Sequence, residues 1–222
     1  YWGPNLVRNF NETDGVNVAW VADLDEDKLK LVKSRYPSTK VSKNSDEVIV
    51  SSSVDAVAIA TPVSTHFDLS LKALQAGKHV LVEKPMAKTS DECERLIEKA
   101  DKKNLTLLVD HIFPYTGAVR KIKKLIDGDL LGEIYYFDSV RVNLGLFQHD
   151  VNVVWDLAVH DLSILDYLFS EEPTSVSAVG MAHISGQPEN VAYITMFFAS
   201  NIIAHINVNW LSPVKVRKTL IG

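Results

Sequence analysis

The chain has 222 residues, enough to bury one large core or two smaller ones, so its size excludes no enzyme class. Its 23 Lys and Arg against 28 Asp and Glu give a net charge of −5, which lacks the basic excess of a general nucleic-acid binder. A single cysteine, Cys93, excludes an internal disulfide, and no apolar run is long enough to span a bilayer. We therefore expect a cytoplasmic protein with an inert thiol that binds a small molecule, and neither nucleic acid nor membrane.

Both ends of the chain look like interrupted motifs. The chain opens on YWGPNLVRNF, without Met and without a strand ahead of the helix that Pro4 is placed to start. It stops on KVRKTLIG, a strand-like run that no turn closes. We interpret the sequence as part of a longer polypeptide.

The first half alternates predicted strands and helices. In chain order these are a strand over 16–23, a helix from 25 to Pro37, a short helix over 46–51, a strand over 54–61, a helix capped by Ser64 or Thr65 and closed by Gly77, a strand over 79–84, a helix with a Thr89/Glu92 capping box, and a strand over 105–110. Continuous apolar strands separated by amphipathic helices are what a parallel sheet covered on both faces requires. We predict a Rossmann-type, doubly wound α/β domain over residues 1–113, incomplete at its amino end.

The second half has a different pattern. A helix over 116–127, a long strand over 133–143 and a helix over 155–169 precede the strand-like runs TSVSAVGMAH, NVAYITMFFAS, IIAHINVNWL and KVRKTLI. Ser200-Asn201 is typical of a tight hairpin. Consecutive strands predict an α+β domain over residues 114–222, with a mainly antiparallel open sheet and an incomplete carboxyl end.

Gly3 and Asp23 match part of a dinucleotide-binding motif. This motif needs a glycine-rich turn before the first helix and an acid about 20 residues further on that binds the adenosine ribose. If Gly3 is the last glycine of that turn, Trp2 and Gly3 lie at the cofactor and Asp23 lies at the ribose. Asp23 would favour NAD over NADP, since a carboxylate repels a 2′-phosphate. The alternative is an ordinary Asp at a strand end.

Two further strands end on polar residues. Ligands of open α/β sheets bind beyond the carboxyl ends of the strands, which places Thr61, Pro62 and His66 to contact a cofactor. The same residues also make a turn and a helix cap, which is the alternative. Glu83 and Lys84 end HVLVEK at the same edge, and Pro85 forces Lys84 into an extended conformation. Lys84 is then either a proton-transferring group near a nicotinamide or half of a solvated ion pair.

WDLAVHDLSILDYL carries a third polar set. On a helix Asp156 and His160 share one face, where a carboxylate can orient the imidazole and make it a proton acceptor. A surface ion pair or a core histidine is the alternative. We expect Asp161 and Asp166 to be solvated, and no third ligand completes a metal site.

GKHVLVEKPMA, together with ATPVSTH and WDLAVHDLSILDYL, resembles the glucose–fructose oxidoreductase/inositol dehydrogenase (Gfo/Idh/MocA) family over essentially the whole chain. The resemblance implies a Rossmann domain, a carboxyl-terminal domain whose open sheet forms a homodimer or homotetramer, and NAD(P)-dependent hydride transfer to or from a hydroxyl/keto group of a sugar or polyol. The family's catalytic lysine falls on Lys84, and its acid and histidine fall on Asp156 and His160. DHIFPYTGAVRKIK looks most like sugar-nucleotide dehydrogenases, including those acting at C3 of UDP-N-acetylhexosamines and their uronates.

From the resemblance we expect His160 to take the hydroxyl proton, Lys84 to bind the same oxygen and Asp156 to orient His160, with Glu83 at the cofactor edge. Which of Lys84 and His160 is the base stays open. His111, Tyr115, Lys215 and Arg217 are weaker candidates for substrate contacts, the last two for a phosphate or carboxylate. Two alternatives remain: an NAD-dependent glycosidase of the same family, and a non-catalytic dinucleotide-binding regulator.

Overall fold

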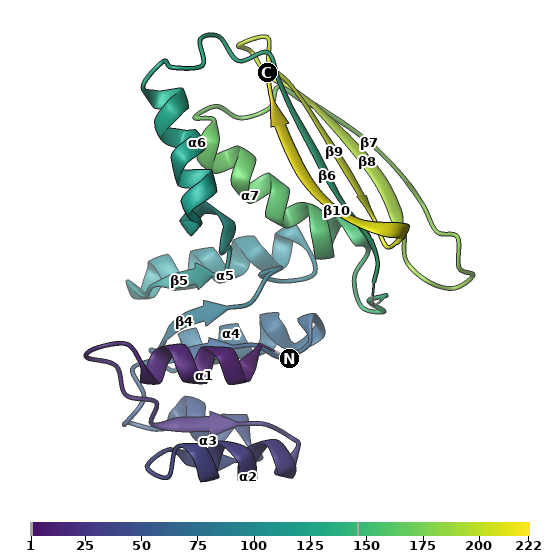
Figure 1. Ribbon diagram of the computed structural model, residues 1–222. Coiled ribbons are helices and arrows are strands. Elements are labelled where there is room, and N and C mark those ends of the chain that lie inside the picture. Colours follow the sequence, from purple (N-terminus) through teal and green to yellow (C-terminus); the bar gives the residue numbers. More distant parts are fainter. Residues whose placement is uncertain (1, 146) are drawn as a thin grey trace. The chain divides into compact units, whose positions relative to one another are not determined.

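The chain divides into two compact units, Tyr1–Asp110 and His111–Gly222, in a computed structural model that describes residues 2–145 and 147–222 (Figure 1). The division lies after residue 110, and the predicted boundary lies after residue 113. Each unit has its own cluster of buried apolar side chains. In the described part of the chain, no helix has the length and apolar character needed to cross a membrane.

Unit 1 alternates helices and strands. Its elements are α1 (Gly3–Asn11), β1 (Trp20–Ala22), α2 (Glu26–Arg35), β2 (Lys40–Ser42), α3 (Ser45–Val50), β3 (Ala56–Ile59), α4 (His66–Gln75), β4 (His79–Val82), α5 (Ser90–Lys103) and β5 (Leu107–Val109). β1 and β2 pair in parallel, and β3, β4 and β5 form a second parallel sheet in that order. The predicted parallel α/β arrangement is confirmed, whereas β2 was not predicted.

Local signals explain where most of these helices begin and end. The Asp25 side chain accepts hydrogen bonds from the amides of Asp27 and Lys28 at the start of α2. Thr89 caps α5 by accepting from the Glu92 amide, as predicted. Gly77 has φ +78° just after α4, a conformation that glycine adopts without strain. Thr65 occupies the predicted N-cap position of α4, but its side chain makes no cap hydrogen bond, because its hydroxyl donates to the carbonyl of Pro62.

The core of unit 1 lies between the three-stranded sheet and its helices. α4 and α5 pack against each other, α4 on β3 and β4, and α5 on β5. The buried apolar side chains are Ile49, Ile59, Ala73, Leu74, Val80, Val82, Leu96 and Ala100. Val80 and Val82 of β4 are buried and Leu81 between them is partly buried, which accounts for the continuous apolar run VLV after the exposed His79. The charged residues Glu83 and Lys84 come directly after this strand, at the carboxyl edge of the sheet.

Unit 2 is a five-stranded sheet with helices against one face. Its elements are α6 (Gly117–Asp127), β6 (Tyr136–Leu144), a π-helical turn (Val154–Ala158) that continues into α7 (Val159–Leu168), β7 (Ser175–Met181), β8 (Val191–Phe197), β9 (Ile203–Asn209) and β10 (Leu211–Ile221). The strand order is β10-β6-β9-β8-β7. Every pairing is antiparallel except β6 with β9, which is parallel. The mainly antiparallel sheet is confirmed, as is the hairpin at Asn201, which has φ +66°.

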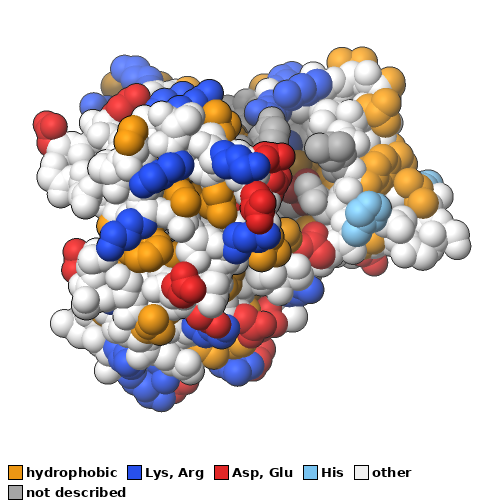
Figure 2. Space-filling view, turned by 90° about the horizontal axis from the view of Figure 1, so that it is seen from below, with side chains coloured by type: hydrophobic (Ala, Val, Ile, Leu, Met, Phe, Trp, Pro, Cys, Tyr) orange, Lys and Arg blue, Asp and Glu red, His pale blue; other side chains and the backbone are white. Residues whose placement is uncertain are grey.

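The two faces of this sheet differ in burial. Alternate residues of β6, β8 and β9, among them Phe137, Ile194 and Ile206, pack with α7 in the core of the unit. The other alternate residues form what we call the outer face, which carries exposed apolar side chains. They include Tyr193 and Phe197 of β8, Ile203 of β9 and, on the neighbouring β7, Val179 and Met181. Figure 2 shows hydrophobic side chains gathered along the sheet of unit 2 at the right of the view.

Candidate functional site

In unit 1 Thr61, Pro62, Glu83 and Lys84, which were predicted from the sequence, lie just beyond the carboxyl ends of β3 and β4. The backbone amide of Glu83 donates to the Ile59 carbonyl (2.9 Å), and that of Asp110 donates to the Val82 carbonyl (2.9 Å). These bonds extend the sheet pairing by one residue past the ends of β4 and β5. Thr61, Glu83 and Asp110 therefore line one edge of the parallel sheet, where ligands bind in this architecture.

His66 joins two of the loops at this edge. Its imidazole is 1% exposed, with Nδ1 2.8 Å from the carbonyl oxygen of Pro85 and Nε2 2.9 Å from that of Thr61. The ring thus holds the loop after β3 against the loop after β4. Thr61 and Pro62 are exposed, and the Thr61 hydroxyl lies 2.7 Å from that of Thr65. A contribution of His66 to cofactor binding would act through these loops, because both ring nitrogens are committed to carbonyl oxygens.

Glu83 and Lys84 differ in their surroundings. Glu83 is 8% exposed, and burial, together with the neighbouring carboxylate of Asp110, raises its pKa. Its Oε2 accepts a hydrogen bond from the backbone amide of Lys84 (3.2 Å). Lys84 is half-buried and is followed by a cis peptide bond to Pro85. The sequence signalled Glu83 and Lys84 but missed Asp110, although it also ends an apolar strand.

The start of α1 and the end of β1 carry the other cofactor residues predicted in unit 1. Gly3 begins α1, Trp2 precedes it with 46% of its surface exposed, and a Cβ placed on Gly3 would meet no atom within 4 Å. Asp23 follows β1, where its Oδ1 accepts from the Asp25 amide (2.9 Å) and its Oδ2 lies 3.6 Å from Lys28 Nζ. An open helix amino end suits a phosphate, and a carboxylate at a strand end suits a ribose.

In unit 2 Asp156 lies in the π-helical turn that precedes α7. The predicted helix over 155–169 is observed, but its first part, Val154–Ala158, is π-helical, so the α-helical i, i+4 spacing of Asp156 and His160 does not hold there. Its Oδ2 accepts a hydrogen bond from the indole nitrogen of Trp210 (3.0 Å), which is 1% exposed. Trp210 follows β9, far from Asp156 in the sequence, so no local pattern predicted the contact. The bond fixes one carboxylate oxygen of Asp156.

His160 lies in the first turn of α7 and is half-buried. Its ring meets that of Phe113 edge to face, with centroids 5.0 Å apart and planes at 70°. Phe113 belongs to a 3₁₀ turn, Phe113–Tyr115, that follows the half-buried His111. Tyr115 is 64% exposed, with the Arg120 guanidinium 5.6 Å from its ring centroid.

Asp161 is buried, so the prediction that it is solvated is wrong. It is 1% exposed, and its carboxylate accepts from Ser139 Oγ (2.7 Å) and from Arg141 Nε (2.8 Å) and Nη2 (3.0 Å). A buried charge of this kind needs a paired and hydrogen-bonded partner, which Arg141 provides. Asp166 is exposed, as predicted.

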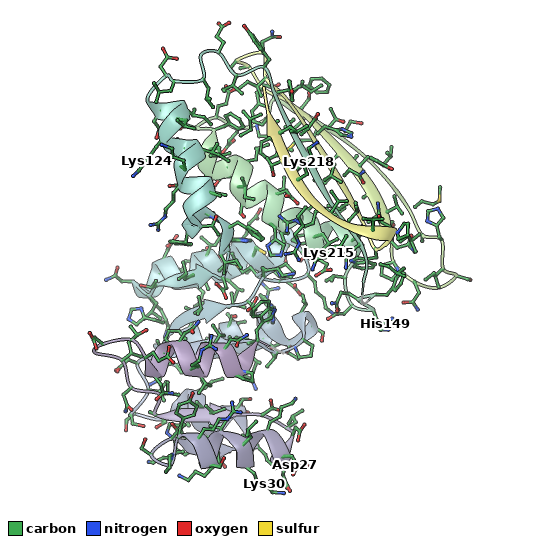
Figure 3. All side chains as sticks on the ribbon, in the orientation of Figure 1. Asp27, Lys30, Lys124, His149, Lys215 and Lys218 are labelled. Atoms are coloured by element: carbon green, nitrogen blue, oxygen red, sulfur yellow. The ribbon has the colours of Figure 1, made fainter. Side chains whose placement is uncertain are left out.

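The weaker substrate candidates on β10 are exposed. Lys215 lies in the stretch where the register with β6 shifts between Leu211 and Val216, and Arg217 lies opposite Arg141 in the β6 register. Figure 3 shows Lys215 and Lys218 projecting from β10. Lys218 lines a hollow on the outer face with Asp138 and His205. Within residues 2–145 and 147–222, no three His, Cys, Asp or Glu side chains are grouped so as to hold a metal ion.

Comparison with known families matches both units. Residues 1–111 match the description "Oxidoreductase family, NAD-binding Rossmann fold", and residues 119–222 match the "GFO/IDH/MocA C-terminal domain". The open backbone at Gly3 and the carboxylate of Asp23 fit a dinucleotide, which agrees with the first description. The structural match is also close: an NAD-binding protein from Listeria innocua has a TM-score of 0.90 at 25% identity, over 100% of this chain and 68% of that one.

Several of the matched relatives carry named activities, among them a sugar-nucleotide dehydrogenase and an inositol dehydrogenase. The chain is 35% identical to the UDP-N-acetylglucosamine 3-dehydrogenase of Acidithiobacillus ferrooxidans over 61% of this chain and 42% of the relative. It is 29% identical to the scyllo-inositol 2-dehydrogenase (NAD(+)) of Bacillus subtilis over 81% of this chain and 53% of the relative. The chain thus spans about half the length of the curated relatives it matches. From its two family domains, the chain belongs to the Gfo/Idh/MocA oxidoreductase family.

Proposed function

We propose that the chain is part of an NAD-dependent dehydrogenase that transfers hydride between the nicotinamide and a sugar or sugar nucleotide, oxidising a hydroxyl-bearing carbon or reducing the corresponding keto group. The observation that carries this proposal is Lys84, a half-buried cation beyond the carboxyl end of β4 in a unit of the NAD-binding family. The UDP-N-acetylglucosamine 3-dehydrogenase relative supports C3 of a UDP-N-acetylhexosamine or its uronate as the reacting centre. The inositol dehydrogenase relative supports a free polyol as the second choice.

Asp23 supports NAD over NADP as the cofactor. Its carboxylate follows β1 and has 37% of its side chain exposed, so it is accessible to a ribose hydroxyl. The same charge would repel a 2′-phosphate. Trp2, Gly3, Thr61, Pro62 and Glu83 complete the proposed cofactor contacts, with His66 acting on the Thr61 and Pro85 loops.

The proposed proton chemistry uses three side chains. Bound NAD supplies the hydride acceptor for the oxidation. His160 accepts the proton of the substrate hydroxyl, and the Lys84 ammonium donates a hydrogen bond to the same oxygen, which stabilises its developing negative charge. Asp156, fixed by Trp210, orients His160 or binds a neighbouring hydroxyl. His111, Tyr115, Lys215 and Arg217 are proposed substrate contacts, of which Lys215 and Arg217 would bind a phosphate or carboxylate.

The test uses the full-length protein. NAD and NADP are titrated by calorimetry, and UDP-N-acetylglucosamine, its uronate and myo-inositol are then screened for absorbance of reduced nicotinamide. Lys84→Ala and His160→Ala should each lower kcat by about a hundredfold or more, whereas Lys88→Ala, at an exposed lysine four residues on, should not. Absence of binding of both cofactors refutes the proposal. Sugar release without net reduced nicotinamide indicates the glycosidase, and cofactor binding without turnover indicates the regulator.

We also propose that the outer face of unit 2 joins copies of the chain into a homodimer or homotetramer. Its exposed Tyr193 and Phe197 supply apolar contact area, and Asp138 and Lys218 in its hollow allow opposite charges to meet when the same face of two copies packs together. Tyr193→Glu should lower the mass in sedimentation experiments, and Leu24→Glu, at an 83% exposed site of unit 1, should not. Equal masses for both variants contradict this interface. The lone Cys93, which can form no internal disulfide, supports a reducing, cytoplasmic location.

A further inference from the structure

A buried polar cluster in unit 2 fixes α7 to the sheet. Asp161 in α7 accepts three hydrogen bonds, and both donor residues, Ser139 and Arg141, lie on β6. The Arg141 side chain is 7% exposed and the Asp161 side chain 2% exposed, so water does not compete for these bonds. We call Ser139, Arg141 and Asp161 the Asp161 cluster. It sets where the first turn of α7 lies on the sheet.

The Asp161 cluster reaches His160 by two routes. One is the backbone, because His160 and Asp161 are successive residues. The other passes through Phe113: the Arg141 guanidinium lies 4.5 Å from the centroid of the Phe113 ring, and that ring meets the His160 ring at 5.0 Å. Phe113 therefore lies in contact with both a fixed cation and the imidazole.

The desolvation cost of the Asp161 cluster indicates that its role is to orient α7 rather than to stabilise the fold. A buried ion pair costs desolvation, and apolar residues of similar volume often stabilise a fold as well or better. The core around it is already large and apolar, with Phe137, Leu165 and Trp210 among its buried members. Arg141 Nη1 is in addition buried without a hydrogen-bond partner among the described residues. What the cluster adds is direction, because a bidentate guanidinium–carboxylate pair allows one orientation.

We infer that the Asp161 cluster and Phe113 are positioning residues that hold the His160 ring in one orientation for proton transfer. This inference rests on the proposed function, in which His160 accepts the substrate proton. Proton transfer requires the acceptor within hydrogen-bond reach of its donor, and a misplacement of about 1 Å can lower the rate by about a hundredfold. Loss of the positioning should therefore lower kcat and leave cofactor binding unchanged.

Phe113→Leu tests the inference, with Phe169→Leu as the matched control. Phe169 lies in the same core and makes a similar edge-to-face contact, with Phe137 at 6.2 Å, away from His160. The full-length enzyme is assayed with NAD and the best substrate of UDP-N-acetylglucosamine and myo-inositol, and crystal structures of both variants are solved. Phe113→Leu should lower kcat about tenfold or more with the KM for NAD within about twofold of wild type, and leave His160 in more than one rotamer. Phe169→Leu should keep the wild-type kcat and a single rotamer.

A second variant covers the case in which Phe113→Leu fails to fold. Arg141→Met with Asp161→Leu removes both charges together, and it should also lower kcat about tenfold without changing the KM for NAD. Equal kcat losses in the Phe113 and Phe169 variants, or a single His160 rotamer in Phe113→Leu, overturn the inference. A wild-type kcat in His160→Ala would instead show that His160 is not the proton acceptor. The crystal structures of the two Phe variants would then still decide whether Phe113 orients the His160 ring.

Discussion

The Nδ1 atom of His66 lies 2.8 Å from the carbonyl oxygen of Pro85, which binds the loop carrying Lys84 to the start of α4. Nε2 makes the matching contact with Thr61 at 2.9 Å. The imidazole therefore sets the spacing of two loops at the sheet edge, and the arrangement of the proposed cofactor contacts depends on it.

His66→Ala should lower the free energy of unfolding by about 1 kcal/mol for each ring N–H that donates to one of the two carbonyl oxygens, and weaken NAD binding about tenfold. Urea denaturation and calorimetric titration measure the two effects. His79→Ala is the control, since His79 lies at the other end of β4 and accepts one hydrogen bond, from the Thr106 amide. If both variants weaken NAD binding equally, His66 does not act on the cofactor site.

Trp210→Phe should lower kcat about tenfold, because it removes the indole N–H that donates to Oδ2 of Asp156 and so weakens the control of that carboxylate's orientation. The loss of free energy of unfolding should be about 1 kcal/mol, the value of one hydrogen bond. Trp20→Phe is the control, because Trp20 donates to Ser53 in unit 1. A kcat of Trp210→Phe equal to that of Trp20→Phe would show that the indole does not support catalysis.

Glu83 should make the fold less stable as pH rises above its ordinary pKa of 4.5, because burial and the Asp110 charge raise its pKa in the folded state. In the window between 4.5 and the raised pKa, the folded chain keeps a proton that the unfolded chain has released, so the free energy of unfolding falls with pH. Glu83→Gln should remove this fall, measured by urea denaturation at several pH values. Glu98, exposed and with a pKa lowered by Lys102, makes the control Glu98→Gln. If the free energy of unfolding of Glu83→Gln falls with pH as it does in the wild type, the fall does not come from Glu83.

Asp161→Ala should lower the free energy of unfolding by about 3 to 5 kcal/mol, since it leaves the Arg141 guanidinium buried without its carboxylate. The double variant Arg141→Met with Asp161→Leu should recover most of that loss. Chemical denaturation of wild type and both variants makes the comparison. If the double variant is as unstable as Asp161→Ala, the ion pair contributes stability and not only direction.

The first unit was predictable because its strands are apolar runs broken by helix caps and glycines. Thr89 and Gly77 mark helix ends through local chemistry, and both act as predicted. β2 was missed because Lys40–Ser42 is three residues long with one apolar side chain. Its pairing with β1 depends on a neighbour, which no short window of sequence contains.

The candidate site was predictable only where its chemistry is local. Lys84 comes just after an apolar strand and just before Pro85, so the position of Lys84 beyond the end of β4 could be inferred from the sequence. Asp161 was predicted in solvent because nothing near it in the sequence marks Arg141 as its partner. Likewise, nothing near Asp156 in the sequence marks Trp210 as its hydrogen-bond donor. Burial of a charge depends on residues that the fold brings together, so it was visible only in the structure.

The parallel pairing of β6 with β9 has a consequence for folding. It joins Tyr136 to Ile203 in the middle of the sheet, after α7 and two other strands have intervened in the chain. Contacts between segments so distant must overcome a large loop-closure entropy, so the centre of this sheet should form late and slowly. Until then, the core that surrounds Arg141 and Asp161 lacks β9, and those two charges can remain hydrated. The Asp161 cluster should therefore lose its water only when the last strands join, which makes its desolvation a late step in the folding of unit 2.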